Sequence, residues 1–217
     1  MELSKLFLMT EIELTARPGR TARRAAANRE AIIDAAEQLL VEGGLGAVSV
    51  EAVAERADVA IQTVYNRVGR RPEVLVAIAE RAVDENRRYM ETAFASDGTP
   101  LDRIVAAAHA YVSFALDRPH QFQLLSTPPD EPEALQRIAD KIDEQIGRLA
   151  DILAAGVADG TFISTLDPPA AATALWAMME GVLALGWRTD RKAVEPESLR
   201  RLTDFAVSTI LTGIRAR

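Results

Sequence analysis

Apolar residues recur three and four positions apart through most of the chain, and this spacing constrains the fold more than any other feature of the sequence. Such spacing gathers apolar side chains on one face of an α-helix. Glycines and prolines divide the pattern into separate segments. Alternating runs joined by a hairpin turn, which indicate β-strands, do not occur in the 217 residues. The sequence therefore predicts an all-α protein.

The composition is that of an ordinary globular protein. The chain is 48% hydrophobic and 26% charged, which separates it from disordered chains. It contains no cysteine, which excludes disulfides and thiolate metal sites. No run of 18 apolar residues occurs, so we expect no membrane span and a cytoplasmic location. Residues 1–20 are interpreted as a flexible extension, in which Met9 is an alternative start to Met1.

Three segments after this extension predict three helices. The first, "TARRAAANREAIIDAAEQLLVEGG", has one apolar stripe and ends at a glycine pair, as amphipathic helices often do. In the second, Ser49 can cap a short helix, and Glu51 in its first turn suits the helix dipole. The third runs from about Ile61 to Val68, and Gly69 ends it.

The rest of the chain predicts longer helices. Pro72 suits the first position of a helix that runs to about Ser96, because its missing N–H is no loss there. Further helices are expected at residues 101–117, 120–126, 132–158, 168–187 and 196–214, separated by segments rich in proline and glycine. We expect one domain over residues 21–71 and a second over residues 72–217.

The second and third predicted helices form a helix-turn-helix arrangement. On the third helix, Val64 and Val68 lie four residues apart and face inward. The opposite face carries Gln62, Thr63, Asn66 and Arg67. The major groove of B-DNA admits one α-helix, and the amides of Asn and Gln can pair bidentately with adenine. This arrangement favours a DNA-binding function.

The charge of the chain is unevenly distributed. Its net value of −7 alone argues against a nucleic-acid partner. However, residues 14–72 hold nine Arg against seven Asp and Glu, whereas residues 73–217 hold 15 basic and 22 acidic residues. The N-terminal basic run is interpreted either as a solvated arm or as a contact with phosphates or the minor groove, and we expect it to be disordered in the absence of DNA.

The stretch "NREAIIDAAEQLLVEGGLGAVSVEAVAERADVAIQTVYNRVGRRPEVLVAI" resembles the DNA-binding domain of the TetR (tetracycline repressor) family of bacterial transcription regulators. The resemblance lies in the helix that ends in "LLVEGG", in "VSVEAVAERADV", in the pair Thr63 and Tyr65, and in the basic residues that follow. It covers about the first third of the chain, and the remainder is similar only in helical layout. It implies a homodimer that binds double-stranded, palindromic operator DNA, with a C-terminal domain whose small-molecule effector releases the DNA.

The resemblance also implies roles for single residues. By position, Ser49 contacts phosphate, and Arg71 stands where the family often has a phosphate-binding Lys. The predicted DNA-binding set is Ser49, Ile61, Gln62, Thr63, Tyr65, Asn66, Arg67 and Arg71. The chain departs from the family at Ala60, where many members have a capping Ser, and at Gln62 and Val68, where many have Gly and an aromatic residue.

Several of these residues have a second interpretation. Tyr65 either contacts phosphate or is a core aromatic with an exposed hydroxyl. Ile61 either packs inward or meets a thymine methyl group. Arg70 either contacts phosphate or is a solvated charge. Loss of the cap at Ala60 also leaves open a helical partner-binding or ligand-sensing module without sequence-specific DNA binding.

The last two predicted helices suit dimerisation. The segment "DPPAAATALWAMMEGVLALGW" is rich in small apolar residues, and the final helix carries a broad apolar stripe. Two such helices can form a four-helix interface with a two-fold partner. Two ordinary core helices of a monomer are the alternative. The final stripe comprises Leu199, Leu202, Phe205, Ala206, Thr209 and Ile210.

Candidate ligand-binding residues are the aromatic and polar side chains of residues 101–187. Ligand pockets are mostly apolar with a few placed polar groups. The candidates are His109, Tyr111, Phe114, Phe122, Trp176, Met179 and Trp187. Each has a core role as its alternative. His109 is the most notable because its neighbours along the helix are apolar.

An enzyme is the remaining class of function. The chain has two histidines without metal-like spacing, and it lacks a nucleophile elbow, a P-loop and a dinucleotide glycine pattern. We therefore predict no catalysis, no cofactor and no metal site. The leading hypothesis is a ligand-released transcriptional repressor.

Overall fold

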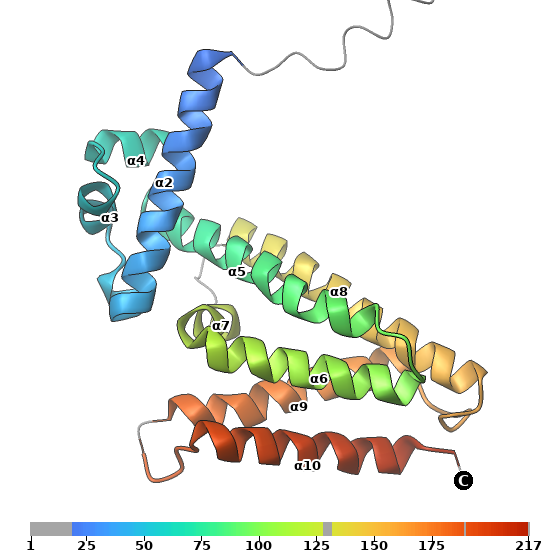
Figure 1. Cartoon of the computed structure of the whole chain (residues 1–217). Coiled ribbons are helices and arrows are strands. Elements are labelled where there is room, and N and C mark those ends of the chain that lie inside the picture. Colours follow the sequence, from blue (N-terminus) through green and yellow to red (C-terminus); the bar gives the residue numbers. More distant parts are fainter. Residues whose placement is uncertain (1–18, 128–131, 189, 217) are drawn as a thin grey trace, which may run out of the picture.

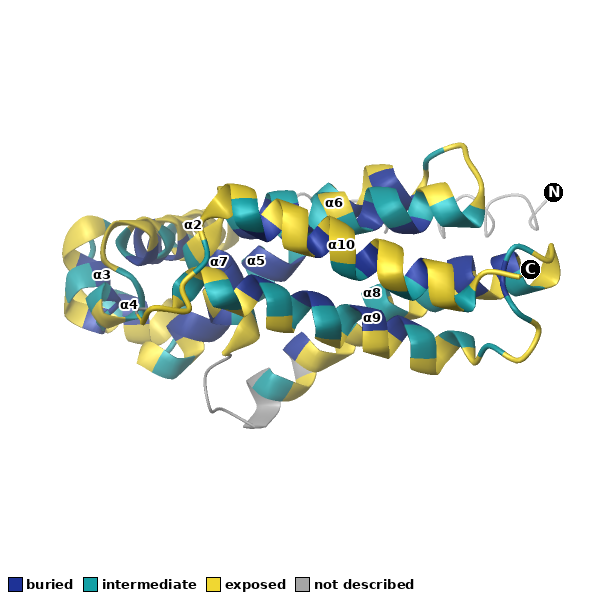
Figure 2. Cartoon of the chain, turned by 90° about the horizontal axis from the view of Figure 1, so that it is seen from below, coloured by how far each residue is buried: buried dark blue, intermediate teal, exposed yellow. Residues whose placement is uncertain are grey.

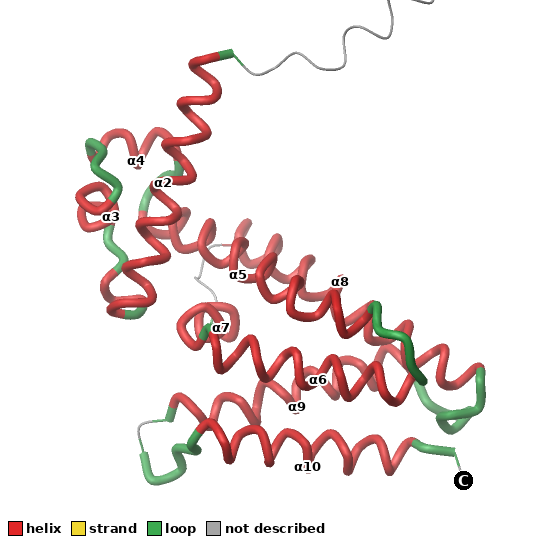
Figure 3. The backbone as a smooth tube through the Cα atoms, viewed as in Figure 1, coloured by secondary structure: helices red, strands yellow, loops and turns green. Residues whose placement is uncertain are grey.

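The computed structural model describes residues 19–127, 132–188 and 190–216. These residues form nine α-helices and two short 3₁₀ helices, and within them there is no β-strand beyond one isolated bridge between Phe162 and Arg215. The tube in Figure 3 shows helices joined by short loops over this part of the chain. The all-α prediction is confirmed.

The N-terminal part is a group of three helices joined by short turns. It comprises α2 (Arg20–Gly43), η1 (Leu45–Ala47), α3 (Val50–Arg56) and α4 (Ile61–Arg67). In Figure 1, α3 and α4 lie on the same side of α2. The apolar stripe of α2 produces this packing, because Ile32, Ala36 and Leu40 are fully buried among residues of α3, α4 and α5.

The C-terminal part is a bundle of longer helices. It comprises α5 (Arg71–Phe94), α6 (Pro100–Asp117), α7 (Pro119–Ser126), α8 (Pro132–Ala158), α9 (Pro168–Leu183), η2 (Ala184–Trp187) and α10 (Pro196–Ile214). Five of these helices start at a proline. Proline has its φ preset for a helix and no N–H to leave unpaired in the first turn. Thr99 and Asp167 add side-chain caps to α6 and α9.

α5 connects the two parts. Its first half contributes Val74, Leu75 and Ile78 to the N-terminal core, and its last turns contribute Met90 and Phe94 to the core of the bundle. Figure 1 shows α5 leaving the N-terminal group and running along α8. The domain boundary predicted at residues 71 and 72 falls in the first turn of this shared helix, and it remains a prediction.

Helix ends agree with the sequence to within a few residues, with two differences. α5 begins at Arg71, so Pro72 is its second residue and not its first. The helix predicted over 168–187 ends as an α-helix at Leu183 and continues as η2. A Cβ atom at Gly186 would lie 2.7 Å from the Leu199 side chain, so this turn is where α10 approaches closely.

Candidate DNA-binding surface and ligand cavity

The turn between α3 and α4 fixes the relative position of the two short helices. Ser49 caps α3 by accepting a hydrogen bond of 3.1 Å from the Ala52 N–H, as expected. In the turn, Asp58 has a positive φ of 51°. Val53 and Val64 are completely buried and join α3 and α4 to the N-terminal core. The geometry is that of a helix-turn-helix unit with α4 as its second helix.

α4 presents a polar surface on the side away from Val64. Gln62, Asn66 and Arg67 are exposed, and Thr63 is partly buried. The Gln62 side-chain N–H donates to the Asn66 side-chain oxygen over 3.1 Å, so the two amides lie one turn apart on one face. Each amide keeps further donors and acceptors. This pair can therefore offer several hydrogen bonds to base edges.

Two apolar side chains lie beside these amides. Ile61 is 43% exposed and Tyr65 is 42% exposed. Neither residue is therefore packed in the core, which is one of the two interpretations of each. Contact of Ile61 with a thymine methyl group and of Tyr65 with phosphate remain predictions.

Arg71 holds the loop that precedes α3. Its Nε donates to the Val48 carbonyl over 2.7 Å, and its Nη2 donates to the Leu45 carbonyl over 2.8 Å. The residue is nevertheless exposed, as are Arg67 and Arg70. Arg71 therefore has a positioning role that the sequence did not indicate, because it fixes the segment that leads to Ser49. Its phosphate contact remains a prediction.

The start of α4 lacks a side-chain cap. Ala60 occupies the N-cap position in extended backbone geometry, and its methyl group accepts no hydrogen bond. The prediction that Ala60 leaves this helix without a side-chain cap is confirmed. Only Val64 among the seven residues of α4 is buried, so both capping and packing hold α4 less firmly than its neighbours.

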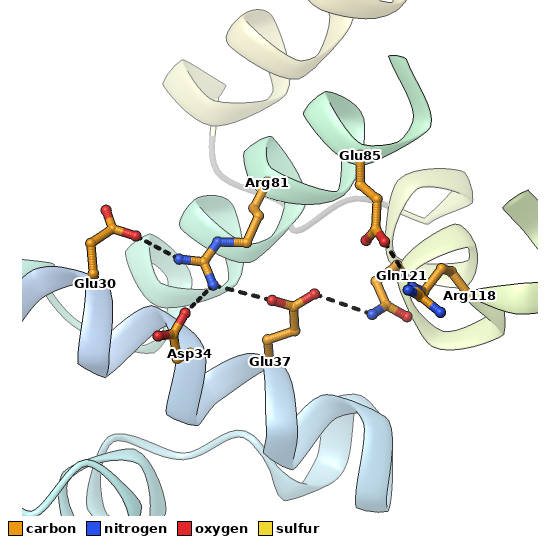
Figure 4. Close-up of polar contacts among 7 residues, drawn as sticks. All are labelled: Glu30, Asp34, Glu37, Arg81, Glu85, Arg118 and Gln121. Atoms are coloured by element: carbon orange, nitrogen blue, oxygen red, sulfur yellow. Dashed lines mark hydrogen bonds and ion pairs between the residues drawn. The ribbon is translucent and has the colours of Figure 1, made fainter. Parts of the chain in front are cut away.

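An ion-pair network joins the helix-turn-helix unit to the bundle (Figure 4). Arg81 of α5 donates to Glu30 over 2.7 Å and to Glu37 over 3.2 Å, and it also pairs with Asp34. Partial burial lowers the pKa of Arg81, but its hydrogen bonds to Asp34 and Glu37 outweigh this effect and raise it. The guanidinium therefore stays charged against one face of α2.

The same network extends to α7. The second oxygen of Glu37 accepts a hydrogen bond of 3.2 Å from the buried amide of Gln121. Beside it, Arg118 donates to Glu85 of α5 over 2.8 Å (Figure 4). This junction is not predicted from the sequence, although Glu30, Asp34 and Glu37 recur at helical spacing on α2.

A cavity of about 90 Å³ lies inside the bundle, among α5, α6, α7, α8, α9 and α10. Its walls are mostly apolar and include Met90, Ile104, Leu149 and Leu175. Among the predicted ligand-binding residues, Tyr111, Trp176 and Met179 line it.

The other predicted ligand-binding residues lie elsewhere. Phe114 and Phe122 are buried in the core, and the Phe122 ring stacks on Trp187 at a centroid distance of 4.9 Å. His109 is exposed, and its Nε2 lies 2.9 Å from Asp204 of α10. Residues two positions apart on a helix point in nearly opposite directions, so His109 faces away when Tyr111 faces the cavity. His109, Phe114, Phe122 and Trp187 therefore do not line this cavity, and their roles in ligand binding stay predictions.

Polar groups occupy several places in the cavity wall, among them Gln145 of α8. Tyr111 donates its hydroxyl to one oxygen of Glu180, and Ser126 donates to the other oxygen over 2.8 Å. Burial raises the pKa of Tyr111 well above its usual value, and the Glu180 charge raises it further. Elsewhere in the wall, Asn86 is 3% exposed, and its amide nitrogen has no hydrogen-bond partner within the described structure.

Three further residues line the cavity and are not predicted from the sequence, namely Asn86, Gln145 and Glu180. A signal for Asn86 was present, because it shares the inward stripe of α5 with Val83 and Met90. Glu180 was visible as the one acidic residue in the apolar segment that became α9. A polar residue on an apolar helical stripe is a reason to expect either a hydrogen-bonded core group or a site.

Two family models match this chain. One, described as bacterial regulatory proteins of the tetR family, matches residues 32–68, which contain the second half of α2 together with α3 and α4. The other, described as the tetracyclin repressor-like C-terminal domain, matches residues 104–210. Together they cover more than half of the chain. The first lies in the N-terminal group of helices and the second lies in the bundle.

Individual proteins give similar results. The HTH-type transcriptional repressor KstR of Mycolicibacterium smegmatis is 32% identical over 102 residues, which is 47% of each chain, so the match spans about half of that relative. The fatty acid degradation regulator FadR from Bacillus halodurans has a similar fold, with a TM-score of 0.71 at 18% identity over 93% of this chain and 100% of that chain. FadR from Bacillus subtilis, solved in complex with stearoyl-CoA, gives 0.69 at 20% identity over 86% and 99%.

Proposed function

The chain belongs to the TetR family of bacterial DNA-binding transcriptional regulators, and on this basis we propose that it is a repressor that binds a palindromic operator as a homodimer and is released by a small, largely apolar ligand. The matched relative KstR is itself named a transcriptional repressor. A regulator of this kind acts in the cytoplasm, where the bacterial chromosome lies.

The exposed face of α4 is the observation that carries the proposal. It combines a hydrogen-bonded amide pair, Gln62 and Asn66, with the cation Arg67 and the exposed ring of Tyr65. Amides read base edges, cations meet phosphates, and apolar groups meet the thymine methyl. The net charge of −7 does not oppose this role, because the acidic excess lies in the bundle, away from α4.

The exposed face of α9 and α10 supports the homodimer. Residues Pro168–Trp187 are apolar and long enough to span a membrane by length and composition, yet only 22% of this stretch is buried in one copy. On α10, Phe205 is 70% exposed and Leu202 is 39% exposed. Figure 2 shows this exposed side of α10 with α6 and α9 beside it. One stripe of α9 is buried inside the bundle, so α9 is a helix of the folded domain and its opposite apolar face is uncovered. We assign this uncovered face to a second copy of the chain and not to lipid.

The hydroxyl groups on this face of α10 are already satisfied. Ser208 and Thr209 donate to the Phe205 carbonyl, over 3.0 and 2.7 Å, and Thr212 donates to the Ser208 carbonyl over 2.7 Å. Burying these hydroxyls in an interface would therefore leave no donor unpaired. The face behaves as an apolar surface in spite of its three hydroxyl residues.

The junction in Figure 4 offers a route for release. α5, α6 and α7 form part of the bundle, and Arg81 and Gln121 hold α2 to α5 and α7. A ligand that changes the packing of α5 and α6 around the cavity changes where this junction holds α2. The protein then has two arrangements of α2, one that binds DNA and one that the ligand favours. The ligand weakens DNA binding only to the extent that it binds the second arrangement more tightly than the first. The two recognition helices of a dimer must lie about 34–36 Å apart to enter successive major grooves.

The test is binding to DNA from the region upstream of the protein's own gene. A fluorescent fragment should bind with submicromolar affinity, and the affinity should fall steeply as salt rises from about 50 to 200 mM. Arg67→Ala should weaken binding, whereas Arg88→Ala, which removes an equal charge from an exposed site on α5, should not. Affinity equal to that for random duplex would contradict the repressor and favour a helical module without sequence-specific DNA binding.

A further inference from the structure

We propose that the cavity selects a ligand whose buried part is apolar, carries no negative charge and presents a carbonyl-type acceptor to Asn86. This inference deepens the proposed function and rests on it only in treating the cavity as the effector site. It concerns the chemistry of the ligand, which neither the fold nor the similarity to other proteins specifies.

The charge of the wall excludes an anionic group. Among the described residues that line the cavity there is no Lys, Arg or His, and Glu180 is the one charged residue. No cation pairs with Glu180 within the described chain. A ligand carboxylate in this space would meet a like charge across a medium of low dielectric constant, without a counter-ion.

A cationic ligand is not required either. Each oxygen of Glu180 already accepts a hydroxyl hydrogen bond, one from Tyr111 and one from Ser126. These bonds stabilise the carboxylate in the absence of any ligand. The Tyr111 hydroxyl, whose pKa is raised by burial and by Glu180, remains protonated as a donor. The Glu180 site is therefore satisfied as it stands.

Asn86 is the group that is not satisfied. It lies on the inward stripe of α5, lines the cavity, and is 3% exposed, with its amide nitrogen unpaired within the described structure. An unpaired buried donor is unfavourable for the protein, and a partner supplied by a ligand recovers the hydrogen bond. The amide nitrogen donates, so the matching ligand group is an acceptor such as the carbonyl of a ketone, an ester or an amide.

The rest of the wall selects an apolar body. Met90, Ile104, Leu175, Met179 and Val207 contribute side chains from four different helices. These five side chains bury carbon and offer no hydrogen-bond donor, so affinity rises with the apolar area of the ligand that fits. The other donors of the lining are the amide of Gln145 and the indole of Trp176. The three features together define a neutral, largely apolar carbonyl compound.

Four small probes of similar size test this selection by calorimetry on the full-length protein. Acetophenone and ethylbenzene differ only by a carbonyl in place of a methylene group, and benzoate and benzylamine add opposite charges. We expect acetophenone to bind about 5–10-fold more tightly than ethylbenzene, because one hydrogen bond contributes roughly that factor. We expect benzoate to bind at least about tenfold more weakly than acetophenone. Tightest binding of benzoate or benzylamine, equal binding of acetophenone and ethylbenzene, or no binding of any probe would overturn the proposal.

Two variants identify the responsible groups. Asn86→Leu keeps the volume of the side chain, so acetophenone should fall to the affinity of ethylbenzene while ethylbenzene keeps its own. An equal loss for both probes would indicate a damaged cavity and overturn the role of Asn86. Glu180→Gln removes the charge, so benzoate should gain affinity relative to ethylbenzene by about tenfold. No relative gain would overturn the electrostatic exclusion.

A parallel DNA-binding assay separates this inference from the proposed function. If the probes bind in the expected order but leave operator binding unchanged, release by a ligand in this cavity is wrong and the selectivity stands. If operator DNA is released by anions and not by neutral carbonyl compounds, the selectivity is wrong and ligand-controlled repression stands.

Discussion

α4 and the face formed by α9 and α10 both leave large apolar side chains in water, but they differ in what surrounds these side chains. On α4, Ile61 and Tyr65 are interleaved with amides and a guanidinium. On α10, Leu202 and Phe205 lie beside α9, whose exposed positions are small residues such as Ala174, Ala177 and Gly181. Both surfaces are apolar enough to bind a partner, so their polar groups decide which partner each can take.

The polar groups of the two surfaces are used in opposite ways. The amides of Gln62 and Asn66 share one hydrogen bond and keep the rest of their donors and acceptors for water or a partner. The hydroxyls of Ser208, Thr209 and Thr212 donate to their own helix and need nothing further. The first surface suits a partner rich in hydrogen-bonding groups, such as a DNA groove. The second suits a partner that packs against it, such as a copy of itself.

The largest expected effect comes from placing a charge in the second surface. Phe205→Asp should weaken the dimer by at least about a hundredfold, because the symmetric interface would bury two unpaired carboxylates and lose two aromatic rings. Analytical ultracentrifugation over a range of concentrations would measure this change. Affinity for a full palindromic operator should fall with the dimer.

A matched control is available on α2. Val41 is also a large exposed apolar residue, at 50%, but it lies outside the face of α9 and α10. Val41→Asp should leave the dimer unchanged. If both variants dissociate equally, or if Phe205→Asp stays dimeric, then the surface of α9 and α10 is not the interface.

The next effect tests whether α4 contacts the bases of the operator. Asn66→Ala should lower the preference for the correct base at one base pair of each half-site by roughly 10–100-fold. Its affinity for random duplex should change little. Binding to a set of operators with single substitutions would reveal the position. Uniform loss over all operators and random DNA would assign Asn66 to the phosphate backbone instead.

Arg71→Ala should have a smaller effect that does not depend on sequence. The side chain lies beyond α4 and bonds the carbonyls of Leu45 and Val48, so its loss frees the loop that leads to Ser49. We expect about 5–10-fold weaker binding to all duplexes and a loss of roughly 1–2 kcal/mol in unfolding free energy. If the residue also contacts phosphate, the slope of log affinity against log salt should fall by about one. An unchanged slope would leave only the positioning role.

The sequence predicts the helices of this fold well because their limits are set locally. Proline and glycine act within one turn, so α6, α7, α9 and α10 begin where their prolines stand. The outward face of α4 follows from its own periodicity together with the burial of Val64. Both predictions depend on neighbours within a few residues.

The cavity is predicted less well because its wall is assembled from six helices. Which side of α6 faces a space and which faces a neighbour depends on the crossing of α5, α8 and α10, and no local pattern encodes it. Phe114 and Tyr111 are equally plausible from sequence, yet one fills the core and the other lines the cavity. The bonds of Arg71 escaped prediction for the same reason, since their acceptors lie 23 and 26 residues away.

The smallest expected effect tests how firmly α4 is held. Ala60→Ser should supply the missing cap and stabilise the protein by about 1 kcal/mol in chemical denaturation, and Ala60→Gly should stabilise it by a few tenths of a kcal/mol less than serine does, because glycine is also a favourable N-cap residue. Because α4 has one buried residue and no side-chain cap, part of its ordering is expected to occur on DNA. A preformed cap lowers that cost, so Ala60→Ser should bind operator and random duplex about two- to fourfold more tightly, with the same ratio between them. A serine that stabilises the free protein without tightening DNA binding would show that α4 is already fully ordered before it meets the groove.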